Sequence, residues 1–321
     1  MNRSDQTAIV TGAAGFVGSH LCDSLLKMGY TVYGIDNFIT GQAKNIDHLE
    51  SNGNFHFIKA DVSQPAAKYL PAGLSPDVVF HLASPASPPR YQAHPVETYL
   101  VNSIGTHYLL QHLKEHAPQA RFVFASTSET YGDPAEHPQV EGYWGNVNPN
   151  GVRSCYDEAK RLGETICGVH ARDFGMDVRI VRIFNTYGPR MDLADGRIIP
   201  NFIRQAMDSE PLTIYGDGSQ TRSFCYVSDL VAGIVLMGTL EDLAGETINL
   251  GNPNEEHTAL ATAELVKKAF DKPELEIIFK DLPGDDPTRR KPDISKARQV
   301  LGWSPQVSFA EGLRRVRESL N

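Results

Sequence analysis

Tyr156 and Lys160 are the residues of this chain whose types and spacing most directly suggest chemistry. Residues four apart on a helix share one face, so the Lys160 ammonium would lie near the Tyr156 phenol. A nearby positive charge favours the phenolate, and we therefore expect the pKa of Tyr156 to fall below its free value of about 10. Such a tyrosine takes a proton from an alcohol near neutral pH. An ordinary helix also explains this spacing, so the surrounding sequence must decide.

A glycine-rich turn near the N-terminus supplies part of that context. Residues 7–10 are apolar and β-prone, which predicts a buried strand, and residues 17–25 repeat apolar side chains at helical spacing. Between them stand Gly12, Gly15 and Gly18, so a strand enters a glycine turn that opens a helix. Glycines let the backbone approach a pyrophosphate, and a helix N-terminus adds free N–H groups. A tight turn without a ligand is the alternative, because the spacing is not G-x-G-x-x-G.

Asp36 ends the next predicted strand, residues 31–35, and indicates which dinucleotide would bind. An acid about 20 residues after the glycines accepts hydrogen bonds from an adenosine ribose. Its negative charge would repel a 2′-phosphate, so the sequence favours NAD over NADP.

Three further predicted strands, 55–58, 77–82 and 121–125, alternate with helical stretches. This order predicts an α/β fold of the Rossmann type, with a doubly wound parallel sheet and a smaller, discontinuous α/β substrate-binding domain. Ligands of such sheets bind at the carboxyl ends of the strands. The polar clusters that follow these strands are Asp61-Val62, Ala83-Ser84 and Ser126-Thr127-Ser128-Glu129.

Composition narrows the classes of function. The 321 residues are 41% hydrophobic and 21% charged, as in globular proteins, and the net charge of −9 disfavours a nucleic-acid surface. No apolar run approaches the roughly 20 residues of a membrane span, and the first residues lack a signal-peptide core. The four cysteines show no ligand-like spacing, and Cys155 is interpreted as a packing residue. We expect a cytoplasmic location, no membrane partner and no metal site.

The chain changes character after about residue 185, where turns become denser. Residues 226–235 and 247–251 still resemble a helix and a strand of the first domain. We therefore expect 1–185 plus about 224–251 to bind the dinucleotide, and 186–223 plus about 252–321 to bind the substrate. Arginines in turn-rich parts of the second domain suit phosphate binding by a planar guanidinium, although most surface arginines are simply solvated; they are Arg222, Arg289 and Arg290.

Taken together, these residues resemble the extended short-chain dehydrogenase/reductase family that acts on nucleotide sugars, from residue 7 to about 318. The resemblance rests on Thr-Gly-Ala-Ala-Gly-Phe-Val-Gly at 11–18, Asp-Asn-Phe at 36–38, His-Leu-Ala-Ser at 81–84, the Tyr156/Lys160 pair and Ile-Phe-Asn-Thr-Tyr-Gly-Pro-Arg at 183–190. Within it, the chain is most similar to the UDP-glucuronic acid decarboxylase (UDP-xylose synthase) family. The stretches that carry this are 83–89, 126–134, 143–149, 218–222 and 290–294.

The resemblance implies bound NAD, a UDP-sugar substrate and a homodimer built on the helices near 98–116 and 154–174. It assigns NAD to Gly12, Gly15, Phe16, Val17, Gly18, Asp36, Asn37, Phe38, Thr40, Gly41, Asp61, Val62, Leu82, Ala83, Ser84, Asn102, Ala125, Tyr156, Lys160, Phe184 and Thr186. It assigns the nucleotide sugar to Pro85, Ser87, Asn185, Arg190, Arg197, Tyr215, Gln220, Arg222, Arg289 and Arg290.

The implied reaction begins with oxidation of the sugar at C4 by NAD+, while Tyr156 removes the hydroxyl proton. Lys160 holds the tyrosine anionic, and Thr127 orients the hydroxyl. The 4-keto sugar then loses CO2, because its carboxylate is β to a ketone, and reduction at C4 yields UDP-xylose. The resemblance assigns the binding of the substrate carboxylate to Arg222 and the handling of the proton at C5 to Glu129. There is no net redox change, so a dry site that retains the cofactor is expected.

Ser128 separates this reaction from a related one. Nucleotide-sugar 4,6-dehydratases typically carry Asp-Glu after the threonine, and that aspartate protonates a leaving hydroxyl. Ser128 stands at its position, so water elimination lacks a proton donor. Simple 4-epimerases usually lack a glutamate at position 129, although Glu129 could also be an ordinary turn residue.

One departure from the family pattern bears on the substrate. Decarboxylases of this kind have Lys-Thr before the asparagine, whereas this chain has Leu100-Val101 before Asn102. A 4-epimerase or 4,6-dehydratase of the same fold therefore stays open as an alternative. So does a non-catalytic NAD(H) sensor or scaffold, although it would need neither Thr127 nor the Tyr156/Lys160 pair.

Overall fold

The computed structural model describes residues 6–281 and 289–320. In chain order its first elements are β1 (Thr7–Thr11), α1 (Phe16–Lys27), β2 (Thr31–Asp36), η1 (Ala43–Asn45), η2 (Asp47–Leu49), β3 (Phe55–Lys59), η3 (Ala66–Lys68), β4 (Val78–His81), α2 (Pro88–Ala93), α3 (Pro95–Leu100), η4 (Val101–Gly105), α4 (Thr106–His116), β5 (Arg121–Thr127), η5 (Ser128–Tyr131), α5 (Ser154–Phe174) and β6 (Val178–Ile183). The others are β7 (Thr186–Tyr187), α6 (Ile198–Met207), β8 (Leu212–Tyr215), β9 (Thr221–Ser223), β10 (Cys225–Tyr226), α7 (Val227–Thr239), β11 (Thr247–Leu250), β12 (Glu256–Thr258), α8 (Ala259–Ala269), β13 (Ile277–Lys280), β14 (Arg289–Arg290), α9 (Ser295–Leu301) and α10 (Phe309–Leu320).

Seven parallel strands form the central sheet, in the order β11-β6-β5-β4-β1-β2-β3. The predicted doubly wound parallel sheet is confirmed. The strand order reverses between β1 and β4, because β2 and β3 follow on one side of β1 and β4, β5 and β6 on the other. The last residue of β1, Thr11, pairs with the last residue of β4, His81. Such a switch point is where ligands of open α/β sheets bind.

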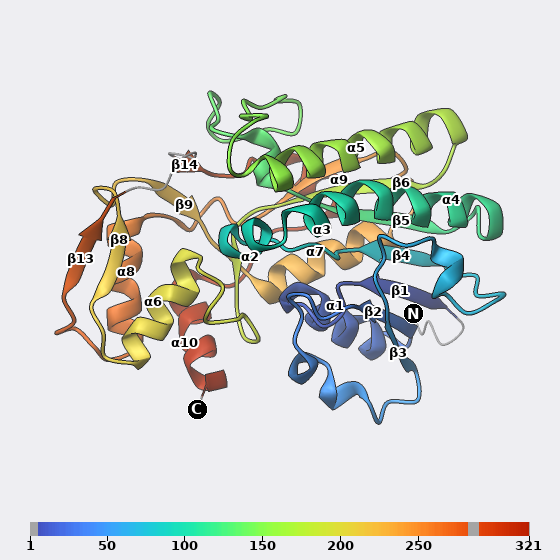
Figure 1. Ribbon diagram of the computed structural model, residues 1–321. Coiled ribbons are helices and arrows are strands. Elements are labelled where there is room, and N and C mark those ends of the chain that lie inside the picture. Colours follow the sequence, from blue (N-terminus) through green and yellow to red (C-terminus); the bar gives the residue numbers. More distant parts are fainter. Residues whose placement is uncertain (1–5, 282–288, 321) are drawn as a thin grey trace.

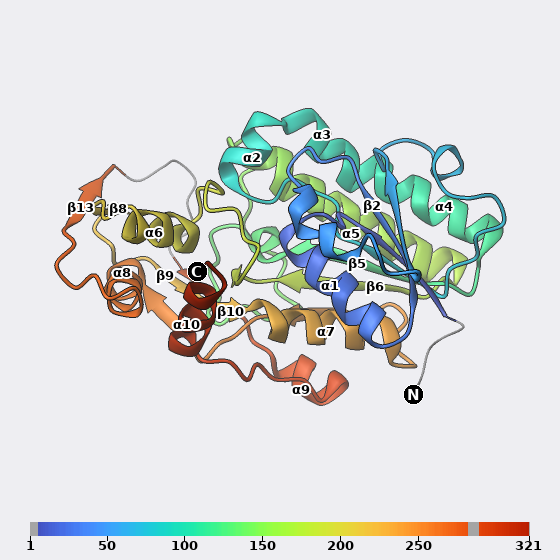
Figure 2. The same cartoon turned by 90° about the horizontal axis from the view of Figure 1, so that it is seen from below.

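Helices cover both faces of this sheet (Figures 1 and 2). The helices α3, α4 and α5 lie on one face, and α1 and α7 lie on the other. Side chains alternate between the faces along β1: Ile9 packs into the core under α4 and α5, whereas Ala8 and Val10 pack into the core under α1 and α7. Both faces of a central strand are therefore buried, which explains why it appears in the sequence as a continuous apolar run.

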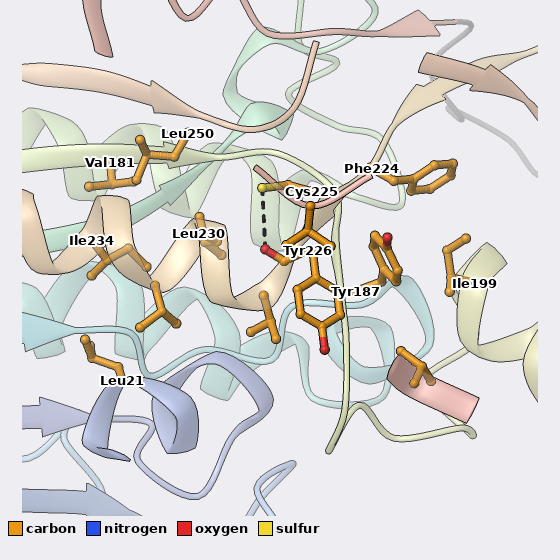
Figure 3. Close-up of a cluster of buried hydrophobic side chains, with 14 of the residues drawn as sticks. Leu21, Val181, Tyr187, Ile199, Phe224, Cys225, Tyr226, Leu230, Ile234 and Leu250 are labelled. Atoms are coloured by element: carbon orange, nitrogen blue, oxygen red, sulfur yellow. Dashed lines mark hydrogen bonds between the residues drawn. The ribbon is translucent and has the colours of Figure 1, made fainter. Parts of the chain in front are cut away.

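The core under α1 and α7 continues into residues 186–223 and 252–320, which are called the second part of the chain below, while the other residues are called the first part. Figure 3 shows Leu21, Val181 and Ile234 packed together, and Tyr187 and Ile199 of the second part extending the same cluster. This second part contains the strand groups β12-β9-β14 and β13-β8 and the helices α6, α8 and α10 (Figure 1).

The division of the chain into 1–185 plus 224–251 and 186–223 plus 252–321 stays a prediction. Helix α9 fits it least well, because it packs against α7 and β11 of the first part (Figure 2).

Two helical predictions have different outcomes. The helix near 154–174 is present as α5, and it ends at Gly175, whose φ of 65° is typical of a left-handed C-terminal cap. The helix near 98–116 is instead divided among α3, the π-helical turn η4 and α4. Within the described residues, no helix is long and apolar enough to cross a membrane.

Candidate active site

A cavity of about 590 Å³ lies at the carboxyl ends of the central strands and between the two parts of the chain. All six residues predicted to be catalytic line it. So do all the predicted NAD-binding residues except Phe38 and Asn102, and all the predicted sugar-binding residues except Arg289 and Arg290. The structure thus brings together residues that are up to about 200 positions apart in the sequence.

The glycine turn forms one end of this cavity. Gly12 has a φ of 73°, and a Cβ at Gly18 would lie 2.0 Å from the Gly12 carbonyl oxygen, so neither position has room for a side chain. Gly15 is the N-cap residue of α1 and has no side chain that could accept from the N–H groups of the first turn, and residues 15–18 line the cavity. A backbone cradle at a helix N-terminus fits the pyrophosphate of a dinucleotide.

Asp36 lies beside this cradle at the end of β2. Its carboxylate accepts hydrogen bonds from the backbone N–H groups of Ala14 and Phe38, at 3.0 and 2.7 Å. Burial raises the pKa of Asp36 above its ordinary value, and these hydrogen bonds oppose the rise. A Cβ at Gly41 would lie 2.8 Å from the carboxylate, so Gly41 keeps the approach to Asp36 open. This arrangement fits the ribose of NAD.

Phe38 and Asn102 do not line the cavity. Phe38 packs on the ring of Phe57, with 5.2 Å between centroids. Asn102 is buried in the π-helical turn, where its amide donates to Ser84 Oγ and to the Thr98 carbonyl, both at 2.8 Å. Asn102 therefore holds Ser84, a predicted NAD contact, from behind.

Tyr156 stands at the centre of the cavity wall on α5. Its side chain is buried, and its ring stacks on Tyr91 of α2 with 5.0 Å between centroids and 4° between planes. Burial raises the pKa of the Tyr156 phenol, and a hydrogen bond to Thr127 lowers it by less. The prediction that this pKa lies below its ordinary value is therefore wrong for the side chains as they stand.

The position of Lys160 explains this result. Its ammonium donates to the Ala125 carbonyl at 2.6 Å and lies 5.8 Å from the centroid of the Tyr156 ring. Burial also lowers the pKa of Lys160 to about 7, so this residue is itself partly uncharged near neutral pH. The i, i+4 spacing places the two side chains on one face of the helix, but it does not determine whether the lysine ammonium points toward the Tyr156 phenol.

Glu129 lines the cavity from η5. Arg290 donates to Glu129 Oε2 at 3.0 Å and to the Ser128 carbonyl at 2.8 Å, and Arg153 donates to the same carboxylate oxygen. Burial alone would raise the pKa of Glu129, but Arg290, Arg153 and Arg222 outweigh it and hold this pKa below its ordinary value.

The arginines predicted from turn-rich segments have different environments. Arg222 lines the cavity, whereas Arg290 is buried against Glu129 and Arg289 is exposed. Neighbouring residues of a strand point to opposite sides, so the pair could not act together. Arg190 lines the cavity and pairs with Asp23 of α1 at 2.6 Å.

Among the residues that sequence reasoning missed are Tyr91 and Arg153, which line the cavity, and Asp157, which lies next to Arg153. The i, i+4 spacing of Arg153 and Asp157 was a usable signal, since it places both on one helix face. Nothing in the sequence indicated that Tyr91, 65 positions before Tyr156, would stack on its ring.

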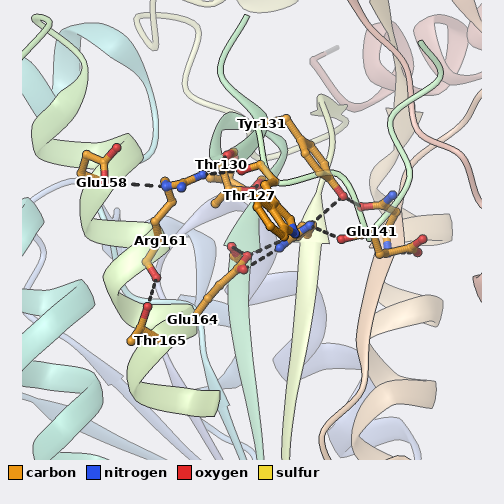
Figure 4. A network of polar contacts seen from close by, with 12 residues as sticks. Thr127, Thr130, Tyr131, Glu141, Glu158, Arg161, Glu164 and Thr165 are labelled. Carbon is orange, nitrogen blue, oxygen red and sulfur yellow. Dashed lines mark hydrogen bonds and ion pairs between the residues drawn. The ribbon is translucent and has the colours of Figure 1, made fainter. Parts of the chain in front are cut away.

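A polar network behind β5 holds η5 in place (Figure 4). Arg182 donates to Glu164 at 2.9 and 2.7 Å and to the Tyr131 hydroxyl at 3.0 Å, and Ser126 donates to Glu164 at 2.5 Å. Arg161 donates to the Thr130 carbonyl at 2.9 Å. These contacts fix both ends of the segment that carries Ser128 and Glu129.

The departure at Leu100-Val101 has a limited effect on the cavity. Val101 lines it, and its carbonyl accepts a hydrogen bond from His81, whose pKa burial lowers to about 3. Leu100 does not line the cavity. The lysine expected from the family pattern at this position would therefore start from outside the cavity wall.

Comparisons with known proteins agree with this geometry. The model of the NAD dependent epimerase/dehydratase family matches residues 8–251. UDP-glucuronic acid decarboxylase 2 of Arabidopsis thaliana is 51% identical over 98% of this chain and 68% of its own length. UDP-glucuronic acid decarboxylase 1 of Xenopus tropicalis is 48% identical over 96% of this chain and 70% of its own length.

Solved structures extend the comparison. UDP-glucuronic acid 4-epimerase from Bacillus cereus, in complex with UDP-glucuronic acid and NAD, has a TM-score of 0.85, 32% identity, and coverage of 98% of this chain and 99% of its own. UDP-glucose 4-epimerase from Thermotoga maritima, with UDP-glucose, has a TM-score of 0.87, 29% identity, and 98% coverage of both chains. The chain therefore belongs to the NAD-dependent epimerase/dehydratase family, as the resemblance of its motifs predicted.

Proposed function

We propose that this protein is a UDP-glucuronate decarboxylase that uses bound NAD to convert UDP-glucuronate into UDP-xylose and CO2. The observation that carries the proposal is the cavity, which joins a dinucleotide cradle to Thr127, Tyr156 and the Ser128–Glu129 pair. Relatives named as UDP-glucuronic acid decarboxylases, 51% identical over 98% of the chain, support it.

The cofactor would be held by backbone and side chains of the first part. The N-terminus of α1 would face the pyrophosphate, and Asp36 would accept hydrogen bonds from the ribose hydroxyls. When bound, NAD supplies the acceptor for a hydride from C4 and the donor that returns it. Because no net redox change occurs, the cavity has to retain the cofactor between turnovers.

Tyr156 is the proton acceptor at C4 in this proposal, and Thr127 orients the sugar hydroxyl toward it. The phenol must first lose its own proton, which burial opposes. An ammonium turned from the Ala125 carbonyl toward the phenolate would supply the compensating charge, and we assign that role to Lys160. The phenol formed when Tyr156 takes the proton later returns it to the C4 oxygen.

Glu129 and Arg222 act after C4 has become a ketone. The bond from C5 to the carboxylate carbon breaks, and its electron pair moves to the C4 oxygen as an enolate. C5 then gains one proton from water, so the reaction consumes one proton overall. We assign the relay of that proton to Glu129 and the binding of the departing carboxylate to Arg222, because both residues line the cavity.

Ser128 favours decarboxylation over dehydration. It is buried and carries no acidic proton, whereas eliminating water needs a donor at the leaving hydroxyl. Incubation with UDP-glucuronate tests the proposal: UDP-xylose and CO2 in equal amounts support it. UDP-galacturonate without CO2 would instead identify a 4-epimerase.

We propose in addition that the protein is a cytoplasmic homodimer. Support for the dimer comes from large apolar side chains exposed on neighbouring elements, namely Val96 and Tyr99 of α3, Ile104 of η4 and Leu162 of α5. Sedimentation of the wild type and of Leu162→Glu tests it, with a monomeric variant as the expected result. Fractionation of cells that produce the protein tests its location.

A further inference from the structure

Arg153 occupies a position that the proposed reaction has not yet used. It is the N-cap residue of α5, three positions before Tyr156, and its side chain is 11% exposed. Its guanidinium donates to Glu129 Oε2 and lies 3.7 Å from Asp157 Oδ2. One cation therefore lies between two carboxylates, one in η5 and one in α5.

Arg290 approaches the same carboxylate from the other side. It donates to Glu129 Oε2 at 3.0 Å, so the two guanidinium groups converge on a single oxygen. None of the described contacts engages Oε1, and Glu129 lines the cavity. The arrangement fixes the carboxylate by one oxygen and leaves the other for a ligand or a water molecule.

The pKa values of the two carboxylates near Arg153, Asp157 and Glu129, are shifted in opposite directions. Burial and the neighbouring Glu129 raise the pKa of Asp157, whereas the arginines lower that of Glu129. Asp157 Oδ1 is buried without a hydrogen-bond partner among the described residues. Among residues 6–281 and 289–320, the charges that face Glu129 include those of Arg153, Arg197, Arg222, Arg290 and Asp157. The phenols of Tyr91 and Tyr156 face it as well.

We propose that Arg153 is a positioning residue, which keeps Glu129 ionised and fixed beside Tyr156 so that the carboxylate can accept a proton from water and pass it to C5. This inference rests on the proposed function. Arg153 touches neither the C4 hydroxyl nor the nicotinamide in this account, and it acts through Glu129. Asp157 competes for the same guanidinium, so its charge limits how strongly Arg153 holds Glu129.

The variants Arg153→Met, Arg153→Lys and Asp157→Asn test the proposal, with Arg172→Met as a matched control, since Arg172 is an exposed arginine of the same helix. The Glu129 carboxylate is titrated directly by infrared difference spectroscopy against a Glu129→Gln protein. We expect its midpoint to rise by about one pH unit or more in Arg153→Met, to return partway in Arg153→Lys and to fall in Asp157→Asn. The control should match the wild type.

Kinetics supply the second measurement. In a single turnover with UDP-glucuronate at neutral pH, Arg153→Met should slow UDP-xylose formation about tenfold or more, while NADH formation changes by less than about threefold. An unchanged Glu129 midpoint, or equal losses in both steps, would overturn the proposal. If Arg153→Met does not fold, the opposite shift expected for Asp157→Asn decides the question.

The two measurements separate this proposal from the proposed function. The infrared titration needs neither substrate nor turnover, so it judges Arg153 even if the wild type releases no CO2. Absence of CO2 release from the wild type would instead reject the decarboxylase function and leave the titration result standing.

Discussion

Replacing Glu164 by glutamine should weaken the polar network that holds η5 and lower the free energy of unfolding. Glu164 accepts two hydrogen bonds from Arg182 and one from Ser126 (Figure 4). Glutamine has almost the same shape, but it carries no charge, and its amide N–H₂ group faces the N–H groups of Arg182. The substitution therefore leaves a guanidinium in a largely buried site without its counter-ion.

The structure sets the expected size of this effect. Removing one partner of a buried ion pair costs about 3–5 kcal/mol of unfolding free energy. Each side chain of this pair is 14% exposed, and Arg182 keeps its bonds to the Tyr131 hydroxyl and the Glu141 carbonyl. We therefore expect the lower end, about 3 kcal/mol, for Glu164→Gln. Replacing both residues by methionine removes the unpaired charge and should cost less, about 1 kcal/mol.

Urea unfolding of the wild type, the single variant and the double variant measures these values, and Arg172→Met again serves as the exposed control. The Glu164→Gln protein should also form UDP-xylose about tenfold more slowly, because η5 carries Glu129. A loss of less than about 1 kcal/mol in Glu164→Gln, or a double variant less stable than the single one, would refute this reasoning.

Three further predictions concern the cavity itself. Tyr91→Phe keeps the stacked ring and removes a hydroxyl that has no hydrogen-bond partner among the described residues, so kcat for UDP-xylose formation should stay within about twofold of the wild type. Tyr91→Leu removes the ring and should lower kcat about fivefold. Equal losses in the two variants would contradict a role for stacking. Gly18→Ala brings a Cβ to 2.0 Å from a carbonyl oxygen and should weaken NAD binding by calorimetry about 100-fold, while Gly53→Ala, which has nothing within 4 Å, should not. Burial lowers the pKa of Lys160 to about 7, so above that pH the unfolded chain holds a proton that the folded chain has lost. The free energy of unfolding of the wild type should therefore rise with pH, relative to that of Lys160→Met, by about 1 kcal/mol per pH unit between pH ~7.5 and ~9.5, as measured by urea unfolding. Parallel pH profiles of the two proteins would contradict a lowered pKa of Lys160.

The sequence predicted the parts of the site that depend on local pattern. The strand–glycine turn–helix unit around Gly12, the acid Asp36 and the Tyr156/Lys160 pair each lie within short segments whose periodicity or spacing is visible in one dimension. The strand-end clusters could be placed at one edge of the sheet, because parallel strands present their carboxyl ends together.

Features that depend on contacts between distant segments were not predicted. Arg290 is buried because β14 pairs with β9, so its guanidinium reaches Glu129 of η5 across 161 positions and does not reach the cavity. The pKa of Tyr156 rises because its surroundings are buried, which helix spacing does not reveal. The π-helical turn around Asn102 interrupts a stretch whose composition alone favours a continuous helix.

The measurement that tests the central claim most directly is the reaction of the purified protein with UDP-glucuronate labelled with ¹³C at the carboxyl carbon. The account predicts labelled CO2 and UDP-xylose in equal amounts, both lost in Tyr156→Phe. Complete retention of the label in the nucleotide sugar, or turnover of Tyr156→Phe as fast as the wild type, would contradict it.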